Sequence, residues 1–235
     1  MDRIPEPELM NAAPQVSAYA SADFSEGDAS VLNRLVELCR EFAYEPSSTD
    51  LLLDLGCGPG NIAELLHQQW PTTRVIGLDG AEAMLEAARI RQRGCAGSEA
   101  HLLYRQAFLA ELAVNGWGGV KDCSPFPAAV VISNSLLHHL HHPELLWQAT
   151  CQLSRSGAVV LHRDLRRPAN AQDALALREK YLPDAPEVLR HDYLASLHAA
   201  FTVPEVRAQL DRCGLDALRV EAVADRYLEV SGRLV

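Results

Sequence analysis

Short apolar runs alternate with stretches of helical periodicity along most of the chain. Several of the runs are apolar without interruption, which is typical of strands that are buried on both faces of a parallel sheet. The predicted strands are Leu51–Leu55, Arg74–Asp79, His101–Gln106, Ala128–Ser133 and Gly157–His162. Helices are predicted over Val31–Phe42, Asn61–Gln69, Ala81–Arg93, Phe108–Ala113 and Pro143–Leu153. This order predicts a doubly wound α/β fold, because strand–helix–strand crossovers are right-handed and leave neighbouring strands parallel.

The pattern changes after Asp164. Further helices are predicted over Ala171–Leu182, Pro186–Ala200 and Pro204–Cys213, and two more strands over Ala217–Val223 and Tyr227–Val230. The two strands are separated by three residues only, which permits a hairpin turn but no crossover helix. We therefore predict a seven-stranded, mostly parallel sheet whose last strand is antiparallel.

The same pattern suggests the domain organisation. Residues 1–30 are rich in Pro, Ala, Ser and acidic residues and show weak periodicity, so we expect an N-terminal arm that could serve as a lid. Residues 31–235 fit a single domain, in which 165–213 form a helical insertion on the substrate side. A chain of 235 residues is long enough for one such domain to bury a large core.

Charge and composition limit the partners. The formal net charge of −10 disfavours binding to nucleic acid or to anionic lipid, because both need a basic surface. We find neither an apolar run of about 18 residues, as a membrane span needs, nor the pattern of a signal peptide. Six scattered cysteines are typical of reduced thiols. We expect a cytoplasmic protein with a small-molecule partner; its oligomeric state is left open.

The most informative stretch is Leu51-Leu-Leu-Asp-Leu-Gly-Cys-Gly-Pro-Gly-Asn61. Glycines at a strand-to-helix turn let the backbone approach a ligand, and the following helix presents free N–H groups. The spacing departs from the Gly-x-Gly-x-x-Gly dinucleotide fingerprint, and Pro59 has no N–H to donate. The turn therefore suits a ligand with less phosphate than a dinucleotide.

An acid ends the second predicted strand. Asp79 lies where the carboxylate that accepts hydrogen bonds from ribose hydroxyls is found in doubly wound folds. The alternative is that Asp79 only caps the helix that follows it.

Together, the Asp-Leu-Gly-Cys-Gly-x-Gly motif and this acid resemble the class I S-adenosylmethionine-dependent methyltransferases of the small-molecule type. The resemblance implies S-adenosylmethionine as the cofactor, S-adenosylhomocysteine as the product, and methyl transfer to an O or N atom of a small metabolite, which could be anionic. It also implies a set of cofactor-binding residues, namely Asp54, Gly56, Cys57, Gly58, Gly60, Asp79, Gly80, Met84, Gln106, Ala107, Asn134 and Ser135.

One of these residues has an equally good structural role, and another differs from the residue usual in the family. Met84 could flank the adenine, but it could equally pack in the core of its helix. Gln106 stands where the family usually has an acid for the adenine amino group; its carbonyl can still accept a hydrogen bond.

Histidines follow the fourth predicted strand in the sequence Leu-His138-His139-Leu-His141-His142. His138 and His139 are candidates for acid–base work, because imidazole exchanges protons near neutral pH. Packing or capping is the alternative, and we expect His141 and His142 to lie in solvent. No metal site is predicted, because adjacent side chains diverge and no carboxylate or cysteine pair completes the set.

Arginines follow the fifth predicted strand, and Arg163, Arg166 or Arg167 could recognise an anionic group of the substrate. The alternative is salt bridging with Asp164 or Glu179. Tyr19, in the N-terminal arm, is a further substrate candidate.

Two other function classes compete with a methyltransferase. A non-catalytic S-adenosylmethionine-binding protein would tolerate Gln106, and a nicotinamide-dependent oxidoreductase would use a similar sheet. The glycine spacing and Pro59 argue against the second class. The amino-directed DNA methylases, the cytosine-C5 methylases and the protein arginine methylases are disfavoured, because their Pro-Pro-aromatic turn, Pro-Cys nucleophile and paired-glutamate loop are not visible.

Overall fold

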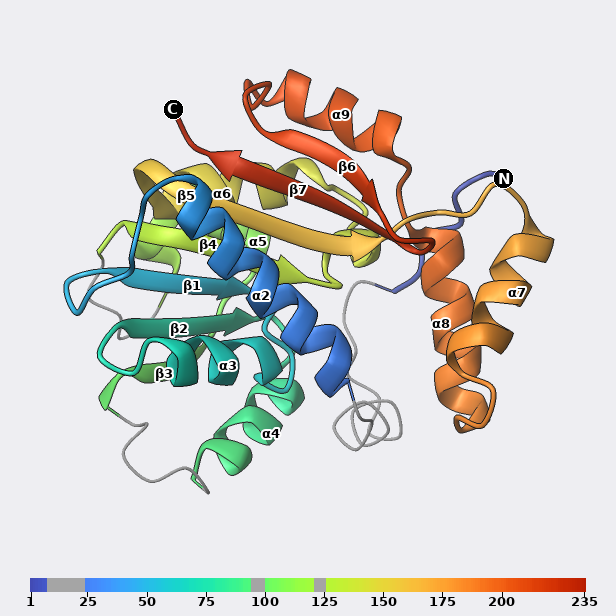
Figure 1. Ribbon diagram of the computed structural model, residues 1–235, viewed down its shortest axis with the longest axis horizontal. Helices are drawn as coiled ribbons and strands as arrows, with labels where there is room; N and C mark the ends of the chain where they lie inside the picture. The colour runs from blue at the N-terminus through green and yellow to red at the C-terminus, as the bar shows by residue number, and fades with distance from the viewer. Residues whose placement is uncertain (8–23, 94–99, 121–125) are drawn as a thin grey trace.

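A seven-stranded sheet forms the centre of the molecule (Figure 1). The computed structural model describes residues 1–7, 24–93, 100–120 and 126–235. The strand order is β3-β2-β1-β4-β5-β7-β6. The strands are β1 (Leu51–Leu55), β2 (Arg74–Asp79), β3 (Leu102–Gln106), β4 (Ala128–Asn134), β5 (Ser154–Leu165), β6 (Arg219–Val223) and β7 (Tyr227–Arg233). The first five pair in parallel, and β7 is antiparallel to both β5 and β6, which confirms the predicted fold class.

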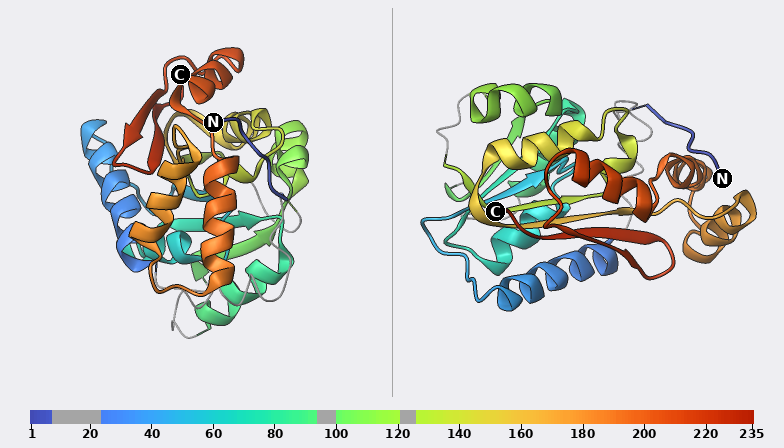
Figure 2. Two further views of the ribbon diagram at one scale, coloured as in Figure 1. Left: turned by 90° about the vertical axis from the view of Figure 1, so that its right-hand side faces the viewer. Right: turned by 90° about the horizontal axis from the view of Figure 1, so that it is seen from above.

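Helices cover both faces of the sheet, so the domain has three layers (Figure 2). One face carries α2 (Ser25–Glu41), α3 (Asn61–Gln69) and α4 (Glu82–Gln92). The other face carries α5 (Leu109–Asn115), α6 (Glu144–Leu153) and α9 (Val203–Arg212). Both faces of β1 are buried, which is why its sequence is continuously apolar apart from Asp54.

Two further helices stand beyond the carboxyl ends of the parallel strands (Figure 1). They are α7 (Ala171–Tyr181) and α8 (Glu187–Ala199), and they pack on each other and on the end of β5 through a small apolar cluster. The predicted insertion 165–213 is therefore divided: α7 and α8 lie at the strand ends, whereas α9 returns to a face of the sheet.

The largest differences between the predicted and the observed element boundaries are in α2 and β5. Helix α2 begins at Ser25, inside the stretch expected to be an arm, and Asp28 in its first turn is buried and accepts a hydrogen bond from Asn61 Nδ2 (2.9 Å). Strand β5 is extended at both ends. Its added carboxyl end pairs with β7, a long-range contact that the local sequence does not encode.

No helix in the described part of the chain is long and apolar enough to cross a membrane.

Candidate active site

The glycine turn between β1 and α3 is held by the end of β2. The N–H groups of Gly56 and Cys57 both donate to the carbonyl of Leu78, at 2.8 and 3.0 Å. Gly56, Gly58 and Gly60 all have positive φ, at +67°, +52° and +88°. Side chains other than that of glycine rarely adopt such values, so the turn needs glycine at these positions.

The space beside the turn differs from one glycine to the next. A Cβ on Gly60 would meet Tyr104 Cζ at 2.8 Å, and one on Gly56 would meet the side chain of Leu136 at 2.6 Å. A Cβ on Gly58 would meet no described protein atom within 4 Å. Gly60 and Gly56 are thus packed against protein, whereas Gly58 faces open space in which a ligand could touch the backbone.

Asp79 joins this turn to the start of α4. Its Oδ2 accepts from the N–H of Gly58 (2.8 Å) and its Oδ1 from the N–H of Ala81 (2.7 Å). Burial raises the pKa of this carboxyl, and the two N–H groups oppose that shift. The N-cap position of α4 is occupied by Ala81, so Asp79 is not its cap residue in the usual sense.

Asp54, at the end of β1, is fully buried beneath the turn. Its Oδ2 has no hydrogen-bond partner among the described residues. Burial, followed by the negative charges of Asp79 and Asp28, raises the pKa of Asp54 well above its usual value. An unpartnered buried carboxyl oxygen is costly, and a donor from a bound ligand would remove that cost.

The remaining predicted cofactor residues of this region lie at or just after the ends of β2 and β3, or on α4. Gln106 donates through Nε2 to the carbonyl of Gly80 (3.0 Å), and the N–H of Ala107 donates to the carbonyl of Asp79 (3.1 Å). Met84 is buried on α4. The structure thus brings Gly80, Gln106 and Ala107 to the end of β2 beside Asp79, and the contact of all four residues with a cofactor stays a prediction.

Asn134 and Ser135 form the sharp turn that ends β4. Asn134 lies opposite Arg163 of β5, and the N–H of Ser135 donates to the carbonyl of that arginine (3.0 Å). Ser135 has a φ of +57°, a strained value for a residue other than glycine. The turn directs the chain into the short helix η3 (Leu137–His139), whose flanking Leu136 packs against Gly56.

His138 is the most buried of the predicted catalytic residues, with 1% of its surface exposed. Its Nδ1 lies 2.5 Å from Asp164 Oδ1 near the end of β5. Asp164 is itself fixed by the N–H groups of Leu137 (2.6 Å) and Leu165 (2.7 Å). This leaves His138 Nε2 facing away from the carboxylate, without a hydrogen-bond partner among the described residues.

Glu6 completes the group from the N-terminal segment. Its Oε1 lies 3.0 Å from His139 Nδ1 and 3.5 Å from His138 Nε2, and Ser196 Oγ of α8 donates to both of its oxygens (3.1 and 3.4 Å). The two imidazole rings lie 4.0 Å apart. Sequence reasoning missed Glu6, Asp164 and Ser196, since each comes from a distant part of the chain.

The charges of this group shift its pKa values in different directions. Burial alone would lower the pKa of His138, but the charge and hydrogen bond of Asp164, with the charge of Glu6, raise it. Burial and the neighbouring His138 lower the pKa of His139. Burial would raise the pKa of Glu6, but the two histidines and Ser196 lower it. The surroundings therefore favour the charged form of both Glu6 and His138.

The same three side chains resemble a metal-ligand set. One ligand atom each from Glu6, His138 and His139 lies within 4.8 Å of the others. The sequence argument against a metal assumed that no carboxylate was available, and Glu6 corrects that assumption. An ion-pair contact of Glu6 with His139 and a hydrogen bond from Ser196 are equally typical of a site without a metal.

The arginines expected to bind an anion have partners within the protein. Arg163 pairs with Glu229 of β7 (2.9 Å) and donates to Ser30 Oγ (3.0 Å), because the reversed last strand places Glu229 opposite it. Arg166 donates to the carbonyls of Ala224, Asp225 and Tyr227 in the β6–β7 hairpin. Arg167 pairs with Glu205 (2.6 Å). All three arginines therefore contact groups within the protein, with different partners from the Asp164 and Glu179 anticipated above, and their role in substrate binding stays a prediction.

The other predicted residues are less involved. Tyr19 lies outside the described residues. His142 is exposed and contacts Glu144, and His141 Nε2 lies 2.8 Å from the carbonyl oxygen of Glu6.

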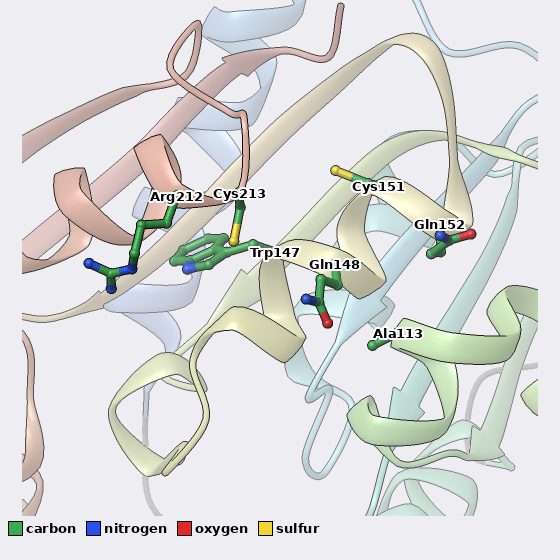
Figure 3. Close-up of a pocket in the computed structure, with 7 residues that line it drawn as sticks. All are labelled: Ala113, Trp147, Gln148, Cys151, Gln152, Arg212 and Cys213. Atoms are coloured by element: carbon green, nitrogen blue, oxygen red, sulfur yellow. The ribbon is translucent and has the colours of Figure 1, made fainter.

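A separate cavity of about 530 Å³ lies between α5, α6 and the end of α9 (Figure 3). It is lined by Ala113, Trp147, Gln148, Cys151, Gln152, Arg212 and Cys213. None of these residues belongs to the glycine turn or to the histidine group.

Comparisons with known proteins identify the family of this chain. A family model described as "Methyltransferase domain" matches residues 28–218. A trans-aconitate 2-methyltransferase of Streptomyces coelicolor is 31% identical over 180 residues, covering 68% of this chain and 54% of that protein. One of Mycolicibacterium gilvum is 37% identical over 123 residues, covering 52% of this chain and 39% of that protein. The matches thus span about half or less of these relatives' length.

Solved structures share the fold at low sequence identity. A plantazolicin methyltransferase, in complex with a desmethyl analogue and S-adenosylhomocysteine, superposes with a TM-score of 0.65 at 13% identity, covering 94% of this chain and 91% of that one. The magnesium protoporphyrin IX methyltransferase of Synechocystis PCC 6803 gives 0.56 at 15% identity, covering 93% and 91%. With the glycine turn, Asp79 and the reversed last strand, the family match over residues 28–218 shows that this chain belongs to the methyltransferase domain family.

Proposed function

We propose that this protein transfers a methyl group from S-adenosylmethionine to a carboxylate oxygen of a small organic acid. The observation that carries the cofactor assignment is the open space beside Gly58, bordered by Asp79, which links the glycine turn to α4. The family match and the trans-aconitate methyltransferases among the relatives support the reaction and the class of acceptor.

The residues present fit such a cofactor. Asp79 would accept from the ribose hydroxyls, and Gly58 would let the ligand approach the backbone. The unpartnered Asp54 Oδ2 offers an acceptor for the amino group of the methionine portion. Gln106 and Ala107 would border the adenine, and Met84 would add an apolar contact to it. Cys57, Gly80, Asn134 and Ser135 complete the proposed lining.

Bound S-adenosylmethionine supplies an activated methyl group on a positively charged sulfur. The protein then has to hold the acceptor in line with that group and to exclude water. A carboxylate acceptor is already ionised at neutral pH and has no proton to lose. His138 and His139 would therefore bind and orient the acid, with Asp164 holding the His138 ring in place.

The arrangement also suits a second possibility, in which the neutral His138 removes a proton from a hydroxyl or amine acceptor. An imidazole oriented by a carboxylate on one nitrogen and free on the other is typical of a general base. The two roles predict opposite pH dependences. Binding of a carboxylate needs protonated His138, so KM should rise as the pH rises through its raised pKa. A general base needs the neutral ring, so kcat should rise over the same range.

Binding and transfer are tested separately. Titration calorimetry with S-adenosylhomocysteine should give saturable heat with the wild-type protein, and no heat would contradict the cofactor assignment. The acceptor class is tested by incubating the protein with methyl-labelled S-adenosylmethionine and a panel of small acids, amines and alcohols, trans-aconitate included. Label in a methyl ester supports the proposal; label only in amines or ethers favours the base mechanism.

Asp50 provides a matched control for Asp79. It lies at the opposite end of β1, where it accepts hydrogen bonds from Ser47. Asp50→Asn should leave affinity for S-adenosylhomocysteine unchanged, whereas Asp79→Asn should lower it.

A further inference from the structure

The carboxylate of Glu6 occupies a site made of hydrogen-bonding groups from two other parts of the chain. Ser196 Oγ, His139 Nδ1 and His138 Nε2 lie at 3.1, 3.0 and 3.5 Å from Glu6 Oε1. The Glu6 side chain is only 13% exposed. An acidic side chain near the start of a chain usually stays in water, because burying a charge is costly unless partners replace the water.

The segment that carries Glu6 is held mainly by other residues. Arg3 stacks on the ring of Phe201 at 3.9 Å and donates through Nη2 to the carbonyls of His138 and Leu140. The N–H of Ile4 donates to the carbonyl of His198 (3.0 Å). The segment can therefore stay attached to α8 and η3 while the Glu6 side chain alone leaves its site.

The site lies next to the proposed cofactor region. Helix η3 carries both histidines, and Leu136 directly before it packs against Gly56 of the glycine turn. A carboxylate bound by these histidines would lie at the edge of the sheet where the methyl donor is proposed to bind.

We infer that Ser196, His138 and His139 form the binding subsite for a carboxylate of the substrate, and that Glu6 occupies this subsite as an internal competitor in the free protein. This inference rests on the proposed function. Because an intramolecular group competes at a high effective concentration, a substrate must displace Glu6 before it can bind. The contacts of Glu6 with Ser196 and the two histidines are consistent with that exchange, in which one carboxylate replaces another.

Neutralising or removing Glu6 should therefore strengthen acid binding. In the presence of S-adenosylhomocysteine, titration calorimetry with trans-aconitate as the probe should show at least threefold tighter binding to Glu6→Gln and Glu6→Ala than to wild type. The KM for an acid that the protein methylates should fall by a similar factor, with a smaller change in kcat. Ser196→Ala, introduced into the Glu6→Gln protein, should reverse the gain, because it removes one donor of the subsite.

Glu144→Gln is the matched control. Glu144 is exposed and lies 3.1 Å from His142 of the same histidine run, so its neutralisation should change neither trans-aconitate binding nor KM. If Glu6→Gln leaves acid binding unchanged or weakens it, Glu6 is not a competitor and the inference is overturned. Loss of acid binding on chelation with EDTA and its return with Zn²⁺ would also overturn it, because Glu6 and the histidines would then be metal ligands.

These outcomes are separable from failure of the proposed function. A protein that binds S-adenosylhomocysteine and methylates an acid, but does not respond to Glu6 substitution, contradicts only the inference. A protein that binds no S-adenosylhomocysteine, or methylates only non-acidic acceptors, contradicts the proposed function itself.

Discussion

The two halves of the carboxyl edge of the sheet use a strand-end aspartate in different ways. Asp79 of β2 accepts from two backbone N–H groups, of Gly58 and Ala81, which the glycine turn and the next helix bring to it. Asp164 of β5 accepts from two N–H groups as well, but it also holds the imidazole of His138 at 2.5 Å. Asp79 thus fixes the conformation of the backbone around it, whereas Asp164 also positions a titratable side chain, that of His138.

The difference has a physical origin. Around Asp79 the partners come from one strand–turn–helix unit and its neighbouring strand, so glycines with positive φ are enough to form the site. Around Asp164 the partners come from η3, α8 and the N-terminal segment, which meet only after the sheet has formed. The first half should therefore be sensitive to backbone changes, and the second half to charge and pH.

The largest expected effect is on the backbone of the first half. Gly60→Ala combines a φ of +88° with a clash against Tyr104, and should lower the free energy of unfolding by about 3 kcal/mol. Gly157→Ala has a φ of +76° but no described atom within 4 Å of the new Cβ, and should cost only about 1 kcal/mol. Urea denaturation measures both. Equal losses would show that the packing of Gly60 against Tyr104 does not matter.

Gly58→Ala separates stability from ligand binding in the same turn. Its φ of +52° predicts a loss of about 1 kcal/mol in stability, as for Gly157→Ala. The new methyl group would enter the open space proposed for the cofactor. The affinity for S-adenosylhomocysteine should therefore fall much more in Gly58→Ala than in Gly157→Ala. Unchanged calorimetric affinity would place the cofactor elsewhere.

Two buried histidines of the second half predict opposite pH dependences of stability. His162 Nδ1 lies 2.8 Å from Ser133 Oγ and its Nε2 lies 3.1 Å from Thr150 Oγ1; burial lowers its pKa to about 3. The unfolded chain binds this proton near pH 6.5, so stability should fall by about 1.4 kcal/mol per pH unit below that value. His138 has a raised pKa, so its contribution is present at low pH and is lost as the pH rises through that pKa.

Denaturation of wild type and His162→Gln between pH 5 and 8 measures the His162 effect. The variant should be less stable at pH 8 but should show a shallower decline toward pH 5, because glutamine does not titrate. Parallel curves would show that another group causes the acid sensitivity.

Exchanging each aspartate for asparagine tests the comparison directly. Asp79→Asn replaces one acceptor oxygen by a donor facing an N–H group, and should weaken S-adenosylhomocysteine binding about tenfold, or about 1.4 kcal/mol. Asp164→Asn should leave that affinity nearly unchanged and instead raise the KM for the acid and shift its pH dependence to lower pH, because the charge of Asp164 raises the pKa of His138. If both variants change only the affinity for S-adenosylhomocysteine, or both change only the KM for the acid, the two halves of the edge do not act separately.

The smallest effect is expected at the hairpin. Arg166→Ala removes hydrogen bonds from a guanidinium to three carbonyls of the β6–β7 turn, and should cost about 0.5–1 kcal/mol in stability without changing KM. A large rise in KM would support the substrate role that the sequence predicts for Arg166.

Much of the fold was predictable because its signals are local. The apolar run at Leu51–Leu55 and the short link between the last two strands specify the parallel core and the reversed strand β7. The glycine turn and Asp79 were predictable for the same reason. By contrast, Arg163 was expected to bind a ligand, but the antiparallel register places Glu229 opposite it.

The sequence by itself determined the order of strands and helices, the glycine turn and the carboxylate beside it, since these depend on backbone conformations that neighbouring residues impose. Only the tertiary structure decided which charged groups meet. Glu6 and Ser196 share one site although 190 positions separate them, and Asp164 reaches His138 across 26. Hydrogen bonds and charge pairs depend on distances that only the packed sheet and its helices set.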